Sequence, residues 1–167
     1  MGRFLITGRQ GSGKTTVIRR LQELGYTAYN TDELEGVTKL QDRLTGEVIG
    51  WPEGVVDWNK YAWNWQEEPL KQLLASDDTV FVGAVVGNQR DFYPLFDKIF
   101  VLTLDTDTLR KRLSIHEHES HHLPEEIDRI SADHEEKQKK YIAEGGSPIQ
   151  ANRSVNEIVD DILIQIK

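Results

Sequence analysis

Residues 8–15 read Gly-Arg-Gln-Gly-Ser-Gly-Lys-Thr and match the pattern G-x-x-x-x-G-K-T. The apolar run Phe4-Leu5-Ile6 comes just before them, and a helix-like stretch follows directly. In this order of strand, glycine-rich loop and helix, the pattern is typical of a phosphate-binding loop, the Walker A motif. An ordinary glycine-rich turn at a strand–helix corner is the alternative, and the matching context on both sides favours the phosphate-binding loop.

The residue types in this loop suit a polyphosphate and a magnesium ion. Glycines let successive backbone N–H groups point inward at phosphate oxygens, and the start of the following helix adds partial positive charge. Lys14 is expected to reach the β- and γ-phosphates, and Thr15 to ligate Mg²⁺. The expected binding set is Gly8, Gln10, Gly11, Ser12, Gly13, Lys14, Thr15 and Thr16.

Composition and charge narrow the class of protein. At 167 residues, the chain suits a single domain over residues 1–167 with a sizeable hydrophobic core. A net charge of -8 argues against a nucleic-acid polymer as partner, because binding to a phosphate backbone depends on a basic surface. The sequence shows no cysteine, no secretory signal and no apolar run near the ~20 residues that span a bilayer, so we expect a cytoplasmic protein without a membrane partner.

Strand-like and helix-like segments alternate along the chain. Strands are expected at residues 3–7, 27–30, 79–86, 98–104 and 148–151. Helices are expected at 14–24, 66–75, 107–113, 124–141 and 154–166, and a capping box of Ser154 and Glu157 opens the last one. This alternation predicts an α/β fold in which helices cover both faces of a five-stranded parallel sheet, a three-layer sandwich.

Two stretches fit neither a core strand nor a core helix. Residues 32–66 contain all four tryptophans among glycines and prolines, and residues 115–123 are rich in histidine and glutamate. Ligands in such folds lie beyond the carboxyl ends of the strands, where insertions can close over them. We therefore expect an insertion at about 32–66 that can cover a ligand, and a lid at about 114–124.

The tryptophans allow two interpretations. They can form an aromatic wall that stacks on a ligand ring, or the core of the insertion itself. Trp58, Tyr61, Trp65 and Pro69 follow helical spacing, which favours packing for Trp58 and Trp65. Trp51 and Trp63 are left freer to meet a ligand.

All five histidines fall between residues 116 and 134. Imidazole is a common metal ligand, so the tract can be read as a transition-metal site. Glutamates alternate with these histidines and no cysteine supports a metal site, which favours an ordinary polar lid loop. The lid histidines are His116, His118, His121 and His122.

Five segments in the same order resemble the small P-loop kinases of the nucleoside-monophosphate-kinase and shikimate-kinase type, an AAA-domain-like group. They are residues 8–15, 29–32, 83–90, 109–113 and 149–154. The resemblance implies a sheet ordered 2-3-1-4-5, an ATP-Mg²⁺ phosphate donor, and a small-molecule acceptor held between the core and the insertion after the second strand. The oligomeric state, monomer or homodimer, stays open.

The resemblance makes Asp32 the candidate that orients or deprotonates an acceptor hydroxyl, because a carboxylate at the mouth of the second strand can accept that proton. A helix N-cap or turn role is the alternative. In shikimate-type kinases the sequence at this position is similar to Asp-x-Asp, whereas this chain has Asn30-Thr31-Asp32. An amide thus replaces the acid that assists Mg²⁺, and the third strand ends without an evident Walker B acid.

Arginines supply the remaining candidates. Arg90, with Asn88 and Gln89, is a candidate acceptor contact, and a surface ion pair with Asp91 or Asp97 is equally open. Arg110 and Arg112 lie on the helix where the kinase pattern puts an arginine beside the adenine or phosphates, and Arg112 is the candidate for that place. The second lid arginine is missing, since position 116 is His. Asn152 and Arg153 correspond to the loop that flanks adenine, or form a solvated turn.

Together these features predict an ATP-dependent kinase for a small hydroxyl- or phosphate-bearing acceptor, such as a nucleoside, a nucleotide or a similar metabolite. Lys14, Asp32, Arg90 and Arg112 are its expected catalytic residues. A nucleotide-binding regulator or degenerate kinase with weak NTPase activity is one alternative, because Asn30 and His116 depart from the kinase pattern. An NTP hydrolase is another, although no Walker B acid or water-orienting glutamine is recognisable.

Overall fold

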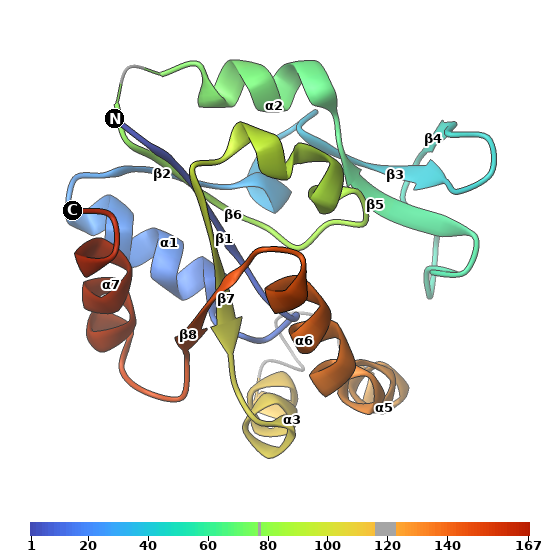
Figure 1. Cartoon of the computed structure of the whole chain (residues 1–167). Helices are drawn as coiled ribbons and strands as arrows, with labels where there is room; N and C mark the ends of the chain where they lie inside the picture. The colour runs from blue at the N-terminus through green and yellow to red at the C-terminus, as the bar shows by residue number, and fades with distance from the viewer. Residues whose placement is uncertain (77, 116–122) are drawn as a thin grey trace.

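Five parallel strands form the central sheet of the computed structural model, which describes residues 1–76, 78–115 and 123–167. Its spatial order is β2-β6-β1-β7-β8, and Figure 1 shows the strands fanning across the middle of the molecule. Counted within this sheet, the order is 2-3-1-4-5, so the predicted α/β topology is confirmed. The strands are β1 Arg3–Thr7, β2 Thr27–Asn30, β6 Val80–Gly83, β7 Lys98–Thr103 and β8 Ser147–Gln150.

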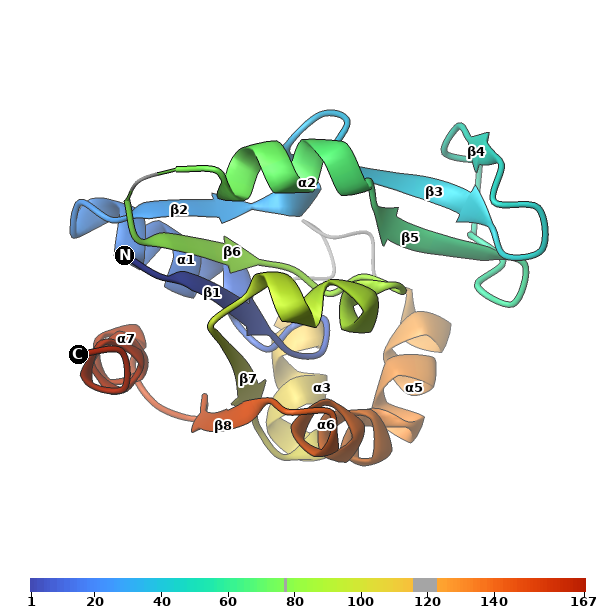
Figure 2. The same ribbon diagram turned by 45° about the horizontal axis from the view of Figure 1, so that its top comes forward.

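Helices cover both faces of this sheet because its three central strands, β1, β6 and β7, are apolar on both sides. In β1, Phe4 and Ile6 pack in a core cluster with α1 and α7, while Leu5 packs in a second cluster with α2. Figure 2 shows α2 on one side of the sheet and α1 and α7 on the other. The helices are α1 Lys14–Glu23, α2 Glu67–Leu74, α3 Thr106–Ile115, α5 Pro124–Ala132, α6 His134–Ala143 and α7 Val155–Ile164, with the 3₁₀ turns η1 Thr31–Glu33 and η2 Gln89–Leu95.

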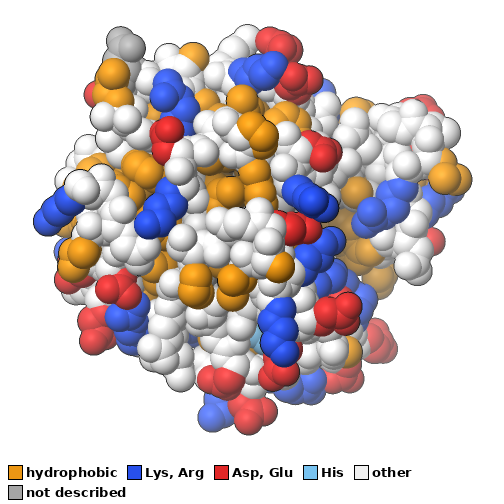
Figure 3. Space-filling model, in the orientation of Figure 1, with side chains coloured by type: hydrophobic (Ala, Val, Ile, Leu, Met, Phe, Trp, Pro, Cys, Tyr) orange, Lys and Arg blue, Asp and Glu red, His pale blue; other side chains and the backbone are white. Residues whose placement is uncertain are grey.

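The acceptor-side insertion folds as a second sheet that the sequence analysis missed. Its antiparallel strands are β3 Thr38–Asp42, β4 Val48–Ile49 and β5 Tyr61–Trp65, in the order β4-β3-β5. The helical spacing assigned to Trp58, Tyr61, Trp65 and Pro69 was therefore wrong. The sheet projects from the main body (Figures 1 and 2), and hydrophobic side chains reach its surface (Figure 3).

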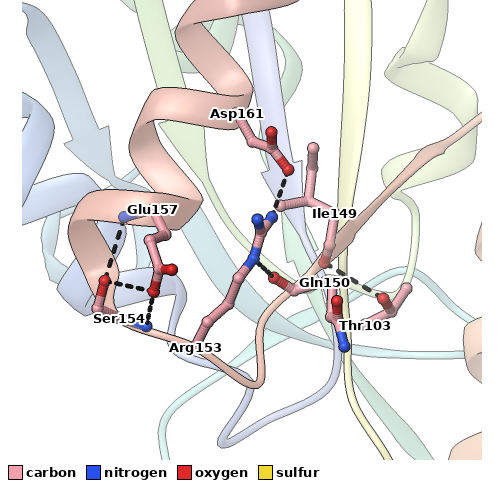
Figure 4. A network of polar contacts seen from close by, with 7 residues as sticks. All are labelled: Thr103, Ile149, Gln150, Arg153, Ser154, Glu157 and Asp161. Atoms are coloured by element: carbon pink, nitrogen blue, oxygen red, sulfur yellow. Dashed lines mark hydrogen bonds and ion pairs between the residues drawn. The ribbon is translucent and has the colours of Figure 1, made fainter.

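Element boundaries near the site differ from the predicted ones for local reasons. The single helix expected at 124–141 is two helices, because Asp133 leaves helical geometry and its carboxylate binds Arg9. The third core strand ends at Gly83, where an added Cβ would lie 2.6 Å from Ile18 Cγ1. The capping box is confirmed, since Ser154 Oγ accepts from the Glu157 N–H and Glu157 Oε2 from the Ser154 N–H (Figure 4).

Candidate active site

The Walker A loop closes over the end of β1 and starts α1. The Ser12 N–H donates to the Arg9 carbonyl over 3.0 Å, and Lys14 Nζ donates to the carbonyls of Gly8 and Arg9 over 2.9 Å each. Gly13 is the N-cap of α1 with φ of 100°, a left-handed conformation that glycine adopts without strain. The lysine ammonium is thereby held over the loop at the start of a helix, where anions bind favourably.

The surroundings of the loop fit a phosphate group. Gly11 has φ of 84°, and an added Cβ there would lie 2.9 Å from Leu113 Cδ2 of α3, so the backbone itself must form this wall. Ser12 Oγ is buried and has no hydrogen-bond partner within the described structure. A buried hydroxyl without a partner is costly, and a bound phosphate oxygen would relieve that cost.

The charge on Lys14 is destabilised by its setting. Burial lowers the pKa of Lys14 from its ordinary 10.5 to about 8, Asp32 opposes that shift, and Arg9 adds to it. An anionic ligand would stabilise the ammonium form, because an opposite charge nearby favours the charged state. The loop therefore combines backbone donors with a cation that gains from a phosphate partner.

Thr15 and Asn30 meet at the point where the sequence predicts the metal ion. Asn30 Nδ2, at the end of β2, donates to Thr15 Oγ1 over 2.9 Å. The hydroxyl oxygen keeps a second lone pair for a Mg²⁺ ion, since a hydroxyl offers two acceptor sites. Thr15 Oγ1 and the Asn30 amide oxygen are hard oxygen donors of the kind Mg²⁺ prefers, so these two side chains would hold the ion.

Arg112 of α3 is hydrogen-bonded to the phosphate loop. Its guanidinium donates to the carbonyl of Ser12 over 3.1 Å and to that of Ala151, at the end of β8, over 2.7 Å. Arg112 thus lies beside the phosphate loop and connects α3 to that loop and to the end of β8. Since two of its N–H groups bind protein carbonyls, Arg112 shapes the phosphate loop in this state.

Arg9 has a structural role that the sequence analysis missed. It occupies a variable position of the motif, its side chain is 8% exposed, and it donates to Asp133 Oδ1 over 2.6 Å and to the Ile130 carbonyl over 3.1 Å. This bond joins the phosphate loop to the junction of α5 and α6. No signal in the loop pattern points to such a contact, because the partner is 124 residues away.

Asp32 lies in η1, directly after β2. Its Oδ1 accepts a hydrogen bond from the indole Nε1 of Trp63 over 2.8 Å, and its charge raises the pKa of Lys14. The residue is exposed, and η1 has no side-chain cap, so the alternative N-cap role is not seen here. The structure thus brings Asp32 to the same side of the molecule as the phosphate loop, with an aromatic neighbour from the second sheet.

A comparison of the sequence with protein families agrees with this geometry. Residues 5–144 match the AAA_18 family, described as an AAA domain. The chain belongs to this family. The resemblance to small P-loop kinases is thereby confirmed, although no curated protein matches the sequence significantly.

Solved structures resemble this AAA domain over nearly its whole length. A shikimate kinase from Acinetobacter baumannii in complex with shikimate has a TM-score of 0.65 at 19% identity, covering 99% of this chain and 93% of that one. A gluconokinase from Sinorhizobium meliloti 1021 gives 0.59 at 18% identity, covering 98% and 90%. A deoxyadenosine kinase from M. mycoides with bound dATP gives 0.57 at 14% identity, covering 98% of each chain. At these identities the likeness establishes the fold.

The loop after β6 is used mainly to hold this AAA domain together. Asn88 accepts from the Trp65 N–H over 2.9 Å and donates to the Trp65 carbonyl over 3.0 Å, which fastens the second sheet to the body. Buried Gln89 accepts from Thr7 Oγ1. Arg90 is exposed and lies 3.8 Å from Glu144, rather than pairing with either aspartate considered from the sequence.

The loop after β8 presents two further predicted contacts. Arg153 donates through Nε to the Gln150 carbonyl over 2.8 Å and through Nη2 to Asp161 of α7, as Figure 4 shows. Its guanidinium is therefore held along α7. Asn152 is exposed and lines a surface hollow of about 380 Å³ between the ends of β7 and β8 and α6.

The lid tract falls largely outside the described residues of this AAA domain. His116, His118, His121 and His122, and with them the metal-site interpretation, belong to that part. The described His134 is buried in α6, with Nε2 2.7 Å from the Leu104 carbonyl. Within the ranges that the structure describes, no helix is long and apolar enough to cross a membrane.

Proposed function

We propose that this protein is an ATP-dependent phosphotransferase, which moves the γ-phosphate of ATP-Mg²⁺ to a small hydroxyl- or phosphate-bearing acceptor such as a nucleoside, a nucleotide or a similar metabolite. The observation that carries the proposal is that the end of β2 meets the phosphate loop. Asn30 Nδ2 donates to Thr15 Oγ1 over 2.9 Å, and Asp32 follows Asn30 by two residues and raises the pKa of Lys14. This contact supports a single site that combines a phosphate cradle with a carboxylate that can receive a proton.

The proposed chemistry follows from these positions. ATP-Mg²⁺ supplies the transferable phosphoryl group and a leaving group, ADP. The loop N–H groups and Lys14 bind the phosphates and balance their charge. Asp32 accepts the proton of the acceptor hydroxyl while that oxygen bonds to the γ-phosphorus and the bond from phosphorus to the β,γ-bridging oxygen breaks.

Other predicted residues take supporting roles in this proposal. Thr15 would ligate Mg²⁺ directly, and Asn30 fixes its hydroxyl. Arg112 keeps the loop in its binding shape through the Ser12 carbonyl. Arg90, Asn152 and Arg153 are proposed ligand contacts, although Arg90 and Arg153 would first have to leave Glu144 and Asp161. We further propose that residues 1–167 act as one cytoplasmic domain.

The similar solved structures support a small-molecule acceptor without indicating which one. Three of these structures are a shikimate kinase, a gluconokinase and a deoxyadenosine kinase, whose acceptors are chemically unlike although the fold is shared. A second candidate is a nucleotide-binding regulator with weak NTPase activity. Asn30 favours it, because an amide in place of a carboxylate holds a metal-bound water less strongly.

A coupled assay of ADP release tests the proposal with nucleosides, nucleoside monophosphates and sugar-like acceptors. Acceptor-dependent ADP supports it, acceptor-independent ADP indicates a hydrolase, and nucleotide binding without ADP indicates a regulator. Lys14→Ala should abolish turnover in either enzymatic case, and circular dichroism should show that the variant is folded. Full turnover by folded Lys14→Ala would contradict the proposed site.

A further inference from the structure

The indole of Trp63 does more than cover the second sheet. Its Nε1–H binds Oδ1 of Asp32 over 2.8 Å, so one carboxylate oxygen already accepts a strong donor. Trp65, two residues further along β5, donates in the same way to Thr31 Oγ1 over 3.0 Å. Trp65 and Trp63 thus hold the neighbouring side chains of Thr31 and Asp32 in the turn after β2. Oδ2 of Asp32 is the oxygen left for an acceptor hydroxyl.

Aromatic surface continues outward from this carboxylate. The ring of Trp51 meets that of Trp63 edge to face, with 5.6 Å between centroids and 87° between planes. Trp58 packs on Trp51 in a similar way at 6.2 Å. Trp51 is nevertheless 61% exposed. A large indole left open beside a polar group is the arrangement by which proteins bind a ring that has both an apolar face and hydroxyl groups.

The charges around the turn disfavour an anionic acceptor. Glu33 and Glu35 are exposed next to Asp32 in the sequence. Arginines of the surrounding elements already have partners: Arg19 lies 3.7 Å from Glu33, Arg43 donates to the carbonyls of Trp58 and Tyr61, and Arg90 pairs with Glu144. Lys39 is opposite Asn64 in the register, and so on the other face of the sheet from Trp63.

We infer that Asp32, Trp63 and Trp51 form the acceptor subsite, and that this subsite takes an uncharged, ring-bearing alcohol, a nucleoside or a cyclic sugar. The inference rests on the proposed function and narrows its acceptor class. Trp63 acts as the positioning residue for Asp32, and Trp51 supplies a stacking face. A carboxylate- or phosphate-bearing acceptor would place its charge beside Asp32 and Glu33, and an arginine could meet that charge only by giving up its present partner.

Matched acceptors test the charge selection. Deoxyadenosine is compared with its 5′-monophosphate, and glucose with glucuronate, by acceptor-dependent ADP release. In the pair that the enzyme phosphorylates, we expect kcat/KM to be at least about tenfold higher for the uncharged acceptor. A negative charge on the acceptor would be repelled by Asp32 and Glu33. The pair that reacts distinguishes a nucleoside from a sugar. A preference for the charged member would overturn the inference.

Variants test the two indoles separately. Trp63→Phe keeps a ring but removes the N–H to Asp32, and should lower kcat about 10- to 100-fold with KM changed less than about threefold. Trp51→Ala should raise KM for the acceptor about fivefold to tenfold while kcat is nearly kept. Leu44→Ala, on the 96% exposed tip of the same sheet, is the control and should change neither. Equal kinetics in all three variants would overturn the assignment of the subsite.

A binding measurement separates this inference from the proposed function. Tryptophan fluorescence is titrated with deoxyadenosine, with glucose and with their charged counterparts, in the presence of a non-hydrolysable ATP analogue. Quenching by an uncharged probe that Trp51→Ala weakens supports the subsite even if no ADP is ever released, in which case only the transfer reaction is contradicted. Quenching by neither uncharged probe, or by the charged ones alone, overturns the inference.

Discussion

Trp63 Nε1 lies 2.8 Å from Asp32 Oδ1 and donates a hydrogen bond to it across 31 positions of the sequence. The bond joins β5 of the second sheet to the turn that follows β2 of the central sheet. Asn88 reinforces the same junction by binding both backbone groups of Trp65. The geometry of the candidate proton acceptor therefore depends on a sheet that is not part of the central fold.

Asp32→Asn is expected to lower kcat about 10²- to 10⁴-fold, because the amide cannot accept the proton of the acceptor hydroxyl. ATP binding should persist at neutral pH. Loss of the Asp32 charge lowers the pKa of Lys14 further, so the comparison is best made about one pH unit below 8, where most Lys14 remains protonated. Glu33→Gln, one residue away, is the control and should keep kcat within about twofold. An Asp32→Asn enzyme nearly as fast as wild type would contradict the assigned role.

The affinity for ATP-Mg²⁺ should fall as the pH rises through about 8. Burial lowers the pKa of Lys14 to that value in the free protein, so the ammonium that phosphate needs is lost above it, and binding there must take up a proton. Calorimetry in two buffers of different ionisation enthalpy measures both the affinity and the uptake. Lys14→Met should bind more weakly, with a flatter profile over the same range. A wild-type affinity that stays constant about one unit either side of pH 8 would show that Lys14 is not the titrating contact.

The central sheet could be predicted because its three middle strands are continuous apolar runs and its phosphate loop has a fixed sequence motif. Phe4, Ile6 and Leu5 are all buried, so the strand needs no alternation to be recognised. The position of Lys14 followed from the motif in the same way. The strand and the phosphate loop each depend on residues close together in the sequence, so a local pattern is enough to predict them.

The second sheet was missed although a signal for it was present. Tyr61, Trp63 and Trp65 recur every two residues, the period of a strand, but pairing Trp58 with Tyr61 and Trp65 imposed a helical period on the same aromatics. The contacts of Arg9 with Asp133 and of Arg153 with Asp161 had no comparable signal. They depend on where helices pack, and nothing in the spacing of either arginine specifies that.

Asn30→Asp should reduce the Mg²⁺ concentration needed for half-maximal activity. Asn30 Nδ2 now donates to Thr15 Oγ1, and a carboxylate in its place would instead accept from that hydroxyl or from a metal-bound water and add a negative charge near the ion. We expect a decrease of about threefold to tenfold, measured by Mg²⁺ titration at saturating ATP, while Asn30→Ala should raise the requirement. An unchanged requirement in both variants would place the metal ion away from the Thr15–Asn30 pair.

Arg9→Met should destabilise the protein by about 1–3 kcal/mol, because it removes donors from Asp133 Oδ1 and the buried Ile130 carbonyl. Lys137 stays within 3.2 Å of Asp133 and limits the loss. In thermal denaturation each kcal/mol corresponds to about 2–4 °C for a chain of this size. The matched control is Lys71→Met, which removes an exposed pair with Glu67 and should cost about 0.5 kcal/mol or less. Equal melting temperatures for the two variants would show that the bond between the phosphate loop and the α5–α6 junction contributes little to stability.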